Sequence, residues 1–338
     1  MAASDNFADL SHSVTLRRYA SLKLTGRATK GHTHMLQDRK ILITGATGQI
    51  AGPIAEDFAK DNEVWCAARF SDPARKLELE ALGINTFVWD MDSGDWSMLP
   101  DDFTHVVHSA LHVTPDYDES ITNNAEASAL LMQHCRKAEA FLHVSSTCVY
   151  KPHQDHPNHA YAENDPLGGL ASYAEVYPVI KMTSEGAVRA AARMLGLPTT
   201  IARMNVGYSW TGHGGLPVMQ YNTFKNGQPW LVPIGYNNIG SPIGGVDIAA
   251  QAHKLLEVAT VPATVINWGG DDPVTDKQMG EYVAELTGVE ASFIETPISF
   301  DSFWADNTRR EQLIGKCSVH WKDGVRDTFE RLGIIEPG

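Results

Sequence analysis

A tyrosine and a lysine, Tyr177 and Lys181, stand four residues apart. On a helix this spacing places both side chains on one face, one turn apart. An unperturbed phenol has a pKa of about 10, too high for efficient proton transfer at neutral pH, but a nearby ammonium favours the phenolate. Tyr177 could therefore donate a proton to a carbonyl, or accept one from an alcohol, while hydride moves at a nicotinamide ring. The pair alone is weak support, because this spacing is also common on surface helices.

A serine precedes this pair in a suitable place. Ser146 lies in the segment HVSSTCVY (143–150), directly after a strand-like apolar run. Its hydroxyl could orient a substrate oxygen and stabilise charge that develops there. The order of serine, tyrosine and lysine strengthens the interpretation that the three act together.

A glycine-rich segment, TGATGQIAG (44–52), separates the first strand-like run from a helical stretch. Gly45 permits a tight turn, Gly48 lets the backbone approach phosphates, and Ala51 is small enough for close helix–strand packing. The N–H groups and the positive dipole end of the following helix favour an anion. The segment therefore predicts a pyrophosphate-binding turn for a dinucleotide.

The end of the second strand indicates which dinucleotide binds. NAD enzymes usually carry Asp or Glu there, whereas this strand ends in Arg69. A guanidinium can pair with the 2′-phosphate of NADP. We therefore expect NADP, with NAD as the alternative. Arg75 and Lys76 carry less weight, because they also fit an ordinary solvated helix face.

These residues need a scaffold, and the chain alternates strand-like and helix-like segments from Lys40 onward. This alternation predicts an α/β fold, a Rossmann-like, doubly wound parallel sheet with a smaller C-terminal substrate-binding lobe. We expect an N-terminal arm over 1–38, a dinucleotide-binding domain over 39–205, and a mainly substrate-binding lobe over 206–338. The predicted strands are 41–44, 64–68, 84–89, 105–109, 141–145 and 199–203. The predicted helices follow the glycine turn and cover 73–82, 117–138, 177–195, 247–259, 275–288 and 322–332.

The chain resembles the extended short-chain dehydrogenases/reductases, the NAD-dependent epimerase/dehydratase group, over about residues 39–333. The resemblance rests on TGATGQIAG (44–52), HVSSTCVY (143–150), ENDP (163–166), YPVIKMTSE (177–185), GGVDIA (244–249) and INWGG (266–270). It implies that Ser146, Tyr177 and Lys181 form a catalytic triad, which Asn124 supports by hydrogen bonding. It also implies a cofactor site and a homodimer formed through the helices near 117–138 and 177–195. The residues expected to contact the cofactor are Gly45, Thr47, Gly48, Gln49, Ile50, Arg69, Asp90, Met91, Ser109, Ala110, Tyr177 and Lys181.

Several positions depart from the family pattern. Thr147 and Cys148 occupy the places of the Asp-Glu pair of sugar dehydratases, which weighs against dehydration. Pro178 would remove a helical hydrogen bond unless the helix begins at Tyr177. Ala51 replaces the third glycine, and His108-Ser109-Ala110-Leu111 matches the usual His-x-Ala-Ala only in part.

The region that follows the sheet contains few cations. Between Met204 and Thr308 the sequence has no Arg and three Lys, at 225, 254 and 277. A sugar nucleotide carries a diphosphate that Arg usually neutralises. The sequence therefore favours an NADP-dependent oxidoreductase for a carbonyl or alcohol group of a small, largely uncharged molecule. Two alternatives remain open: a nucleotide-sugar epimerase with tightly held NAD, its diphosphate clamped by Arg309 or Arg310, and a regulator that senses a dinucleotide without turnover.

Composition and cysteine spacing argue against nucleic acid, membrane and metal as partners. The net charge of −14 argues against nucleic acid, and no apolar run is long enough for a membrane helix. The four cysteines lack CxxC spacing and indicate free thiols in the cytoplasm. Two histidine groups, 105/108/112 and 153/156/159, fix no ligand geometry, so we predict no metal site.

Overall fold

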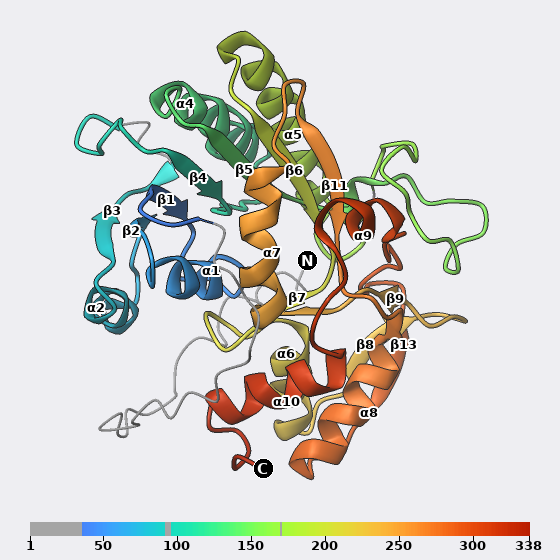
Figure 1. Ribbon diagram of the computed structural model, residues 1–338. Coiled ribbons are helices and arrows are strands. Elements are labelled where there is room, and N and C mark those ends of the chain that lie inside the picture. Colours follow the sequence, from blue (N-terminus) through green and yellow to red (C-terminus); the bar gives the residue numbers. More distant parts are fainter. Residues whose placement is uncertain (1–35, 92–95, 170) are drawn as a thin grey trace. The chain divides into compact units, whose positions relative to one another are not determined.

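The computed structural model describes residues 36–91, 96–169 and 171–338 (Figure 1). Its main sheet has seven parallel strands in the order β3-β2-β1-β4-β5-β6-β11. The strand order reverses between β1 and β4, and ligands bind at such a point in open α/β sheets. The predicted Rossmann-like fold class is confirmed. Most of the N-terminal arm predicted over 1–38 lies outside the described residues.

The strands of the main sheet follow the predicted runs closely. Their bounds are β1 (Lys40–Thr44), β2 (Glu63–Ala68), β3 (Asn85–Val88), β4 (His105–His108), β5 (Ala140–Ser146), β6 (Thr199–Met204) and β11 (Thr264–Trp268). β11 comes from beyond residue 205, yet it pairs with β6 in register Val265 to Ile201. The C-terminal part of the chain therefore contributes to the sheet as well as to the smaller lobe.

The helices cover both faces of the sheet and build the lobe. Their bounds are α1 (Ala51–Phe58), α2 (Pro73–Ala81), α3 (Tyr117–Ile121), α4 (Ala127–His134), α5 (Val176–Leu195), α6 (Leu216–Lys225), α7 (Gly245–Glu257), α8 (Asp276–Thr287), α9 (Thr308–Ile314) and α10 (Trp321–Arg331). Short strands complete the lobe: β7 (Gly207–Tyr208), β8 (Trp230–Pro233), β9 (Ile239–Gly240), β10 (Ile243–Gly244), β12 (Val274–Thr275) and β13 (Phe293–Thr296).

The alternation of side chains along each strand divides the core into two layers. Ile41 and Ile43 of β1 pack in the cluster that α1 and α7 cover, whereas Leu42 packs in the cluster of α4 and α5. This follows from the two-residue period of a strand, which sends successive side chains to opposite faces. Both faces are thereby buried, as a parallel sheet requires. Figure 1 shows α7 crossing the front of the sheet and α5 behind it.

Two helix boundaries differ from the sequence expectation. The helix predicted over 117–138 is interrupted by a π-helical turn at Thr122–Glu126 and ends at His134. α5 begins at Val176, so Pro178 lies inside the helix. Pro178 remains in the first turn, where the backbone N–H has no intrahelical acceptor, and therefore breaks no bond of the helix.

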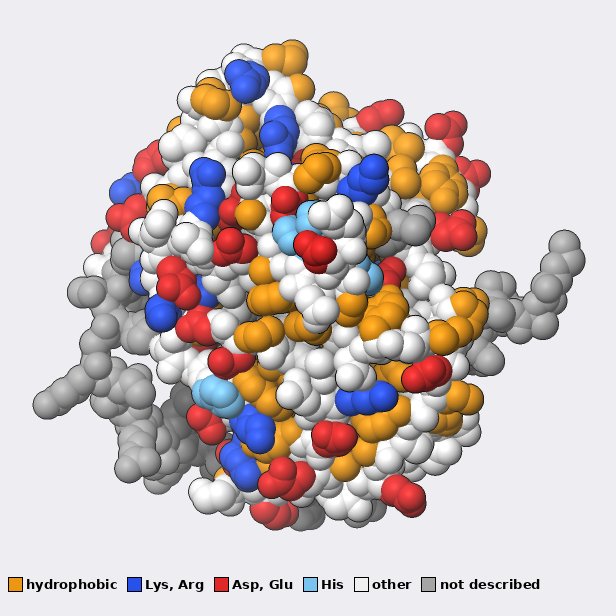
Figure 2. Space-filling model, turned by 90° about the vertical axis from the view of Figure 1, so that its right-hand side faces the viewer, with side chains coloured by type: hydrophobic (Ala, Val, Ile, Leu, Met, Phe, Trp, Pro, Cys, Tyr) orange, Lys and Arg blue, Asp and Glu red, His pale blue; other side chains and the backbone are white. Residues whose placement is uncertain are grey.

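The smaller lobe has its own apolar core. Tyr208, Phe224, Trp230, Val283 and Phe329 are buried together between α6, α8, α10 and the β8–β13 pair. On the face shown in Figure 2, Lys and Arg side chains are interspersed with Asp and Glu. No helix of the described residues is long and apolar enough to span a membrane.

Candidate active site

A cavity of about 630 Å³ opens at the carboxyl ends of the central strands. One part of its wall comes from the glycine-rich turn after β1 and the segment after β4. The end of β5, residues 171–174 and the first turns of α5 form another part, and the end of β6 and the smaller lobe supply the remainder. The lining includes Gly45, Thr47, Gly48, Gln49, Ile50, Ser109, Ala110, Ser146, Tyr177 and Lys181. The structure thus brings together residues that lie far apart in the sequence.

The glycine-rich turn is packed tightly against the segment after β4. Gly45 has φ +75°, and a Cβ there would lie 2.8 Å from the Ala110 nitrogen. The N–H groups of Ser109 and Ala110 both donate to Thr44 Oγ1, each at 3.2 Å. Within the described residues, the N–H groups of Gln49 and Ile50 donate no backbone hydrogen bond. Free donors at the start of α1 fit the pyrophosphate of a dinucleotide.

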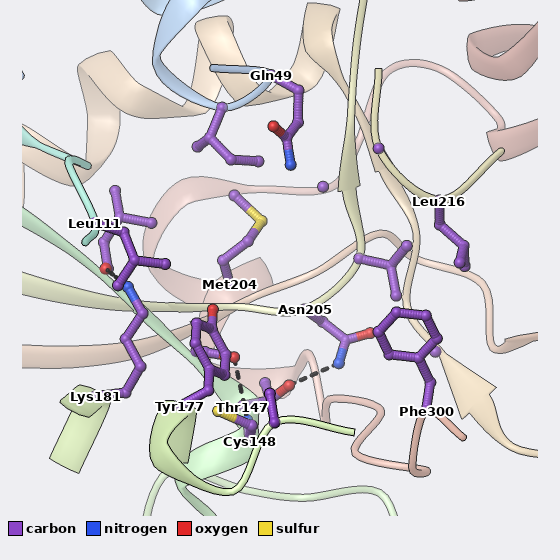
Figure 3. Close-up of a pocket in the computed structure, with 18 of the residues that line it drawn as sticks. Gln49, Leu111, Thr147, Cys148, Tyr177, Lys181, Met204, Asn205, Leu216 and Phe300 are labelled. Atoms are coloured by element: carbon purple, nitrogen blue, oxygen red, sulfur yellow. Dashed lines mark hydrogen bonds between the residues drawn. The ribbon is translucent and has the colours of Figure 1, made fainter. Parts of the chain in front are cut away.

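Tyr177 and Lys181 extend from α5 toward this cavity (Figure 3). The Lys181 ammonium lies 5.7 Å from the centroid of the Tyr177 ring and donates a 3.0 Å hydrogen bond to the Val144 carbonyl. Ser146 lines the same cavity, and its side chain acts to lower the pKa of Tyr177. Ser146 Oγ also accepts the Cys148 N–H at 3.2 Å, which fixes the hydroxyl at the end of β5.

Burial dominates the electrostatics of these groups. Desolvation raises the pKa of Tyr177 well above its ordinary value, and the Ser146 side chain offsets only part of that rise. Desolvation also lowers the pKa of Lys181 to about 8, so its ammonium persists at neutral pH. The lowered tyrosine pKa expected from the lysine is therefore not found in this structure, because desolvation dominates. Tyr177 is a neutral phenol at neutral pH.

Asn124 lies outside the cavity wall, in the π-helical turn. It is buried, and its amide nitrogen donates to the carbonyls of His112 and Ser120 at 2.6 and 2.7 Å. Its amide oxygen accepts the His112 N–H at 3.0 Å. Asn124 therefore holds the segment after β4, which includes the cavity-lining Leu111 and Val113.

A buried ion pair anchors α5 to the sheet. Arg203 of β6 donates to both carboxylate oxygens of Glu185 on α5, at 2.9 and 2.8 Å. Burial alone would raise the pKa of Glu185, but the hydrogen bonds and the charge of Arg203 outweigh it and lower this pKa. Arg203 also donates to the Tyr150 hydroxyl, and Ser145 donates to Glu185. Glu185, the α5 member of the pair, lies one helical turn beyond Lys181.

Asn205 was not anticipated from the sequence. Its amide nitrogen donates to Thr147 Oγ1 at 2.6 Å and to the Phe303 carbonyl at 2.8 Å (Figure 3). Its amide oxygen accepts the Ser241 N–H. Asn205 thus joins the end of β5 to two segments of the smaller lobe. A single polar residue after a strand gave no sequence signal for this role.

Three residues expected at the cofactor do not line the cavity. Arg69 and Asp90 follow β2 and β3, the strands beside β1. Arg69 is exposed and forms no ion pair with another described residue, whereas Arg75 pairs with Glu56 and Glu78. Met91 is buried in the core with Trp89 and Trp96.

The lobe side of the cavity is largely apolar. Leu216 and Phe300 lie on this side in Figure 3, and Met219 and Phe303 also line it. Lys181 is the one Lys or Arg among the described lining residues. Arg310, considered as a phosphate clamp, is fully buried and pairs with Asp271 away from the cavity. His213 lies on the wall.

Metal coordination has no support in the described parts of the chain. No group of three or more His, Cys, Asp or Glu side chains there could hold an ion. Instead, the His153 and His159 rings stack at 3.8 Å, and His159 bonds to Asp165. His108 hydrogen-bonds to Thr44 and Ser128, and burial lowers its pKa to about 3.

The NAD-dependent epimerase/dehydratase family model matches residues 41–223, more than half of the 338 residues. The chain belongs to this family. The resemblance noted from the motifs is thereby confirmed, and the matched region contains the glycine-rich turn, Ser146, Tyr177 and Lys181. No curated protein matches the chain significantly.

Solved structures of this epimerase/dehydratase type share the fold at low identity. A UDP-glucuronic acid 4-epimerase from Bacillus cereus, in complex with UDP-glucuronic acid and NAD, is 20% identical with a TM-score of 0.74, over 87% of this chain and 99% of that one. The Bordetella bronchiseptica enzyme WbmG in complex with NAD is also 20% identical, with a TM-score of 0.73 over 89% and 96%. A UDP-N-acetylglucosamine 4-epimerase from Methanobrevibacter ruminantium is 16% identical, with a TM-score of 0.74 over 88% and 98%.

Proposed function

We propose that this family member is an NADP-dependent oxidoreductase that reduces a carbonyl, or oxidises the corresponding alcohol, of a small and largely uncharged substrate. The observation that carries the proposal is that Ser146, Tyr177 and Lys181 line the same cavity that the glycine-rich turn borders. Tyr177, the proposed proton donor, and the glycine-rich turn, the proposed dinucleotide site, thus line the same cavity.

The side chains divide the work as follows. A dinucleotide bound at the turn supplies the hydride donor or acceptor. Tyr177, neutral because burial raises its pKa, donates a proton to the substrate oxygen in the reductive direction. Ser146, whose oxygen accepts the Cys148 N–H, donates its O–H to the same oxygen and orients it. The Lys181 ammonium stabilises negative charge on Tyr177 after the proton leaves.

The preference for NADP rests on Arg69. Its exposed guanidinium follows β2, the strand beside the turn, and has no ion-pair partner among the described residues. A free guanidinium at this place can pair with a 2′-phosphate in two charge-assisted hydrogen bonds. A carboxylate, the usual NAD determinant, is absent from the end of β2.

A nucleotide-sugar 4-epimerase with tightly held NAD is the second candidate, and the similar solved structures favour it. Two of those named above are UDP-sugar 4-epimerases. The cation-poor cavity favours the oxidoreductase instead, because a desolvated diphosphate needs opposing charge.

The purified protein and a carbonyl panel distinguish the two candidates. The oxidoreductase releases its cofactor on gel filtration and oxidises NADPH with neutral aldehydes or ketones, at higher catalytic efficiency than NADH. Retained NAD together with interconversion of UDP-sugars would establish the epimerase. Failure to oxidise either cofactor with any carbonyl would refute the proposed activity.

A further inference from the structure

An aspartate of the smaller lobe lies on the cavity wall in a distinctive polar cluster. Asp301 stands between the cavity-lining Phe300 and Phe303. Its Oδ1 accepts a 2.9 Å hydrogen bond from the Tyr236 hydroxyl. His156 Nε2 lies 3.3 Å from the same hydroxyl and 3.8 Å from Asp301 Oδ1. Three segments of the chain therefore fix one carboxylate in a largely apolar part of the cavity wall.

The charge of this carboxylate is not neutralised by its neighbours. Burial lowers the pKa of His156, so its imidazole is neutral at neutral pH. Burial raises the pKa of Tyr236, which remains a hydrogen-bond donor. Among the described residues, Asp301 Oδ2 has no hydrogen-bond partner, and the side chain is 22% exposed. Oδ2 is therefore a fixed acceptor that a ligand can use.

The other polar groups nearby are also acceptors. Asp276 lines the cavity, but its carboxylate already accepts from Trp230 Nε1 at 2.9 Å, and burial raises its pKa. The Asn238 amide oxygen is buried without a partner among the described residues. This end of the cavity thus lacks cationic donors and would repel an anion.

We propose that Asp301 selects substrates that carry a hydrogen-bond donor, a hydroxyl or an ammonium, on an apolar body away from the reacting carbonyl. The proposal rests on the proposed oxidoreductase function and specifies its substrate class. Asp301 is a specificity-determining residue that contacts the substrate but takes no part in proton transfer. A group with a negative charge at the same place is disfavoured because the Asp301 carboxylate repels it.

Substituted benzyl alcohols provide the test. Their para-ethyl arm ends in hydroxyl, ammonium, carboxylate or methyl, so the four probes differ only at the distal end. Dissociation constants are measured by calorimetry on the full-length protein with saturating NADP⁺, and oxidation is followed in parallel. The variants are Asp301→Leu, which removes the acceptor, and Asp301→Asn, which keeps a neutral acceptor. Asp155→Asn is the control, since its side chain is 69% exposed and outside the cavity.

The wild-type protein should bind a donor-ended probe at least about tenfold more tightly than the methyl probe, because hydrogen bonds to charged groups are strong. The carboxylate probe should bind most weakly. Asp301→Leu should remove these differences, and Asp155→Asn should keep them. If the relevant donor is a hydroxyl, Asp301→Asn largely retains the preference; if it is an ammonium, Asp301→Asn abolishes it.

Two results would overturn the assignment: a carboxylate probe that binds wild type as tightly as the methyl probe, or a donor preference that survives Asp301→Leu. The dissociation constants could depend on Asp301 as predicted while neither NADP⁺ nor NAD⁺ oxidises any probe. That result would refute the proposed oxidoreductase but not the selection of hydrogen-bond donors by Asp301. The calorimetric ratios therefore separate the two claims.

Discussion

Replacing Arg203 by methionine should destabilise the protein strongly, because it leaves a buried carboxylate without its partner. The side chains of Arg203 and Glu185 are 1% and 2% exposed. The substitution removes two hydrogen bonds to Glu185 and one each to the Tyr150 hydroxyl and the Glu163 carbonyl. Breaking a buried pair by removing one partner costs about 3–5 kcal/mol. For a chain of 338 residues, whose unfolding entropy is about 0.7 kcal/mol/K, that loss lowers Tm by roughly 4–7 °C.

Guanidinium unfolding monitored by circular dichroism gives the free energy directly. Arg189→Met is the matched control, since Arg189 also contacts Glu185, at 3.4 Å, but is 45% exposed; its loss should cost less than about 1 kcal/mol. The double variant Arg203→Met/Glu185→Leu should recover most of the stability, because no unpaired charge remains. A loss below about 1 kcal/mol for Arg203→Met, or a double variant no more stable than the single one, would refute the reasoning.

Three further predictions address the cofactor turn and acid stability. Arg69→Asp should shift the ratio of catalytic efficiencies from NADPH toward NADH, and an unchanged ratio would remove the argument for NADP. Gly45→Ala should cost at least about 1–2 kcal/mol of unfolding free energy, because φ is +75° there and the added Cβ meets the backbone after β4; unfolding as stable as wild type would contradict the described turn. Burial alone would raise the pKa of Asp57, but hydrogen bonds from His253 and Lys60 lower it to about 2. Since the pKa of Asp57 is lower in the folded than in the unfolded chain, Asp57→Asn should cost about 2 kcal/mol of unfolding free energy above pH 4. The difference in unfolding free energy from wild type should shrink as the pH falls toward 2; a difference that does not change with pH would exclude this linkage.

Short-range sequence patterns were sufficient to predict most of the strands and the glycine-rich turn of residues 39–205. Apolar runs followed by glycine or polar residues located β1, β4, β5 and β6 to within about two residues, because a parallel strand buried on both faces must be apolar. The glycine-rich segment indicated a turn, since Gly45 occupies a backbone conformation that other residues avoid. The four-residue spacing of Tyr177 and Lys181 identified a helix face.

Contacts between distant segments could not be predicted in the same way. The π-helical turn at 122–126 lies within a continuous helical pattern, and hydrogen bonding of Asn124 to residue 112 has no local signature. Asn205, Asp301 and Tyr236 acquire their roles only when the lobe folds over the sheet. The pKa of Tyr177 depends on its burial, and the spacing of residues in the sequence does not predict burial.

The central claim is that Tyr177 transfers the proton at the substrate oxygen. Single-turnover hydride transfer from NADPH, measured for wild type and Tyr177→Phe with saturating carbonyl, tests it most directly, and Tyr117→Phe on the exposed start of α3 is the control. We predict that Tyr177→Phe slows hydride transfer by about 10²–10⁴-fold while NADPH binding and the Tyr117→Phe rate stay close to wild type. Hydride transfer at the wild-type rate in Tyr177→Phe would contradict the account.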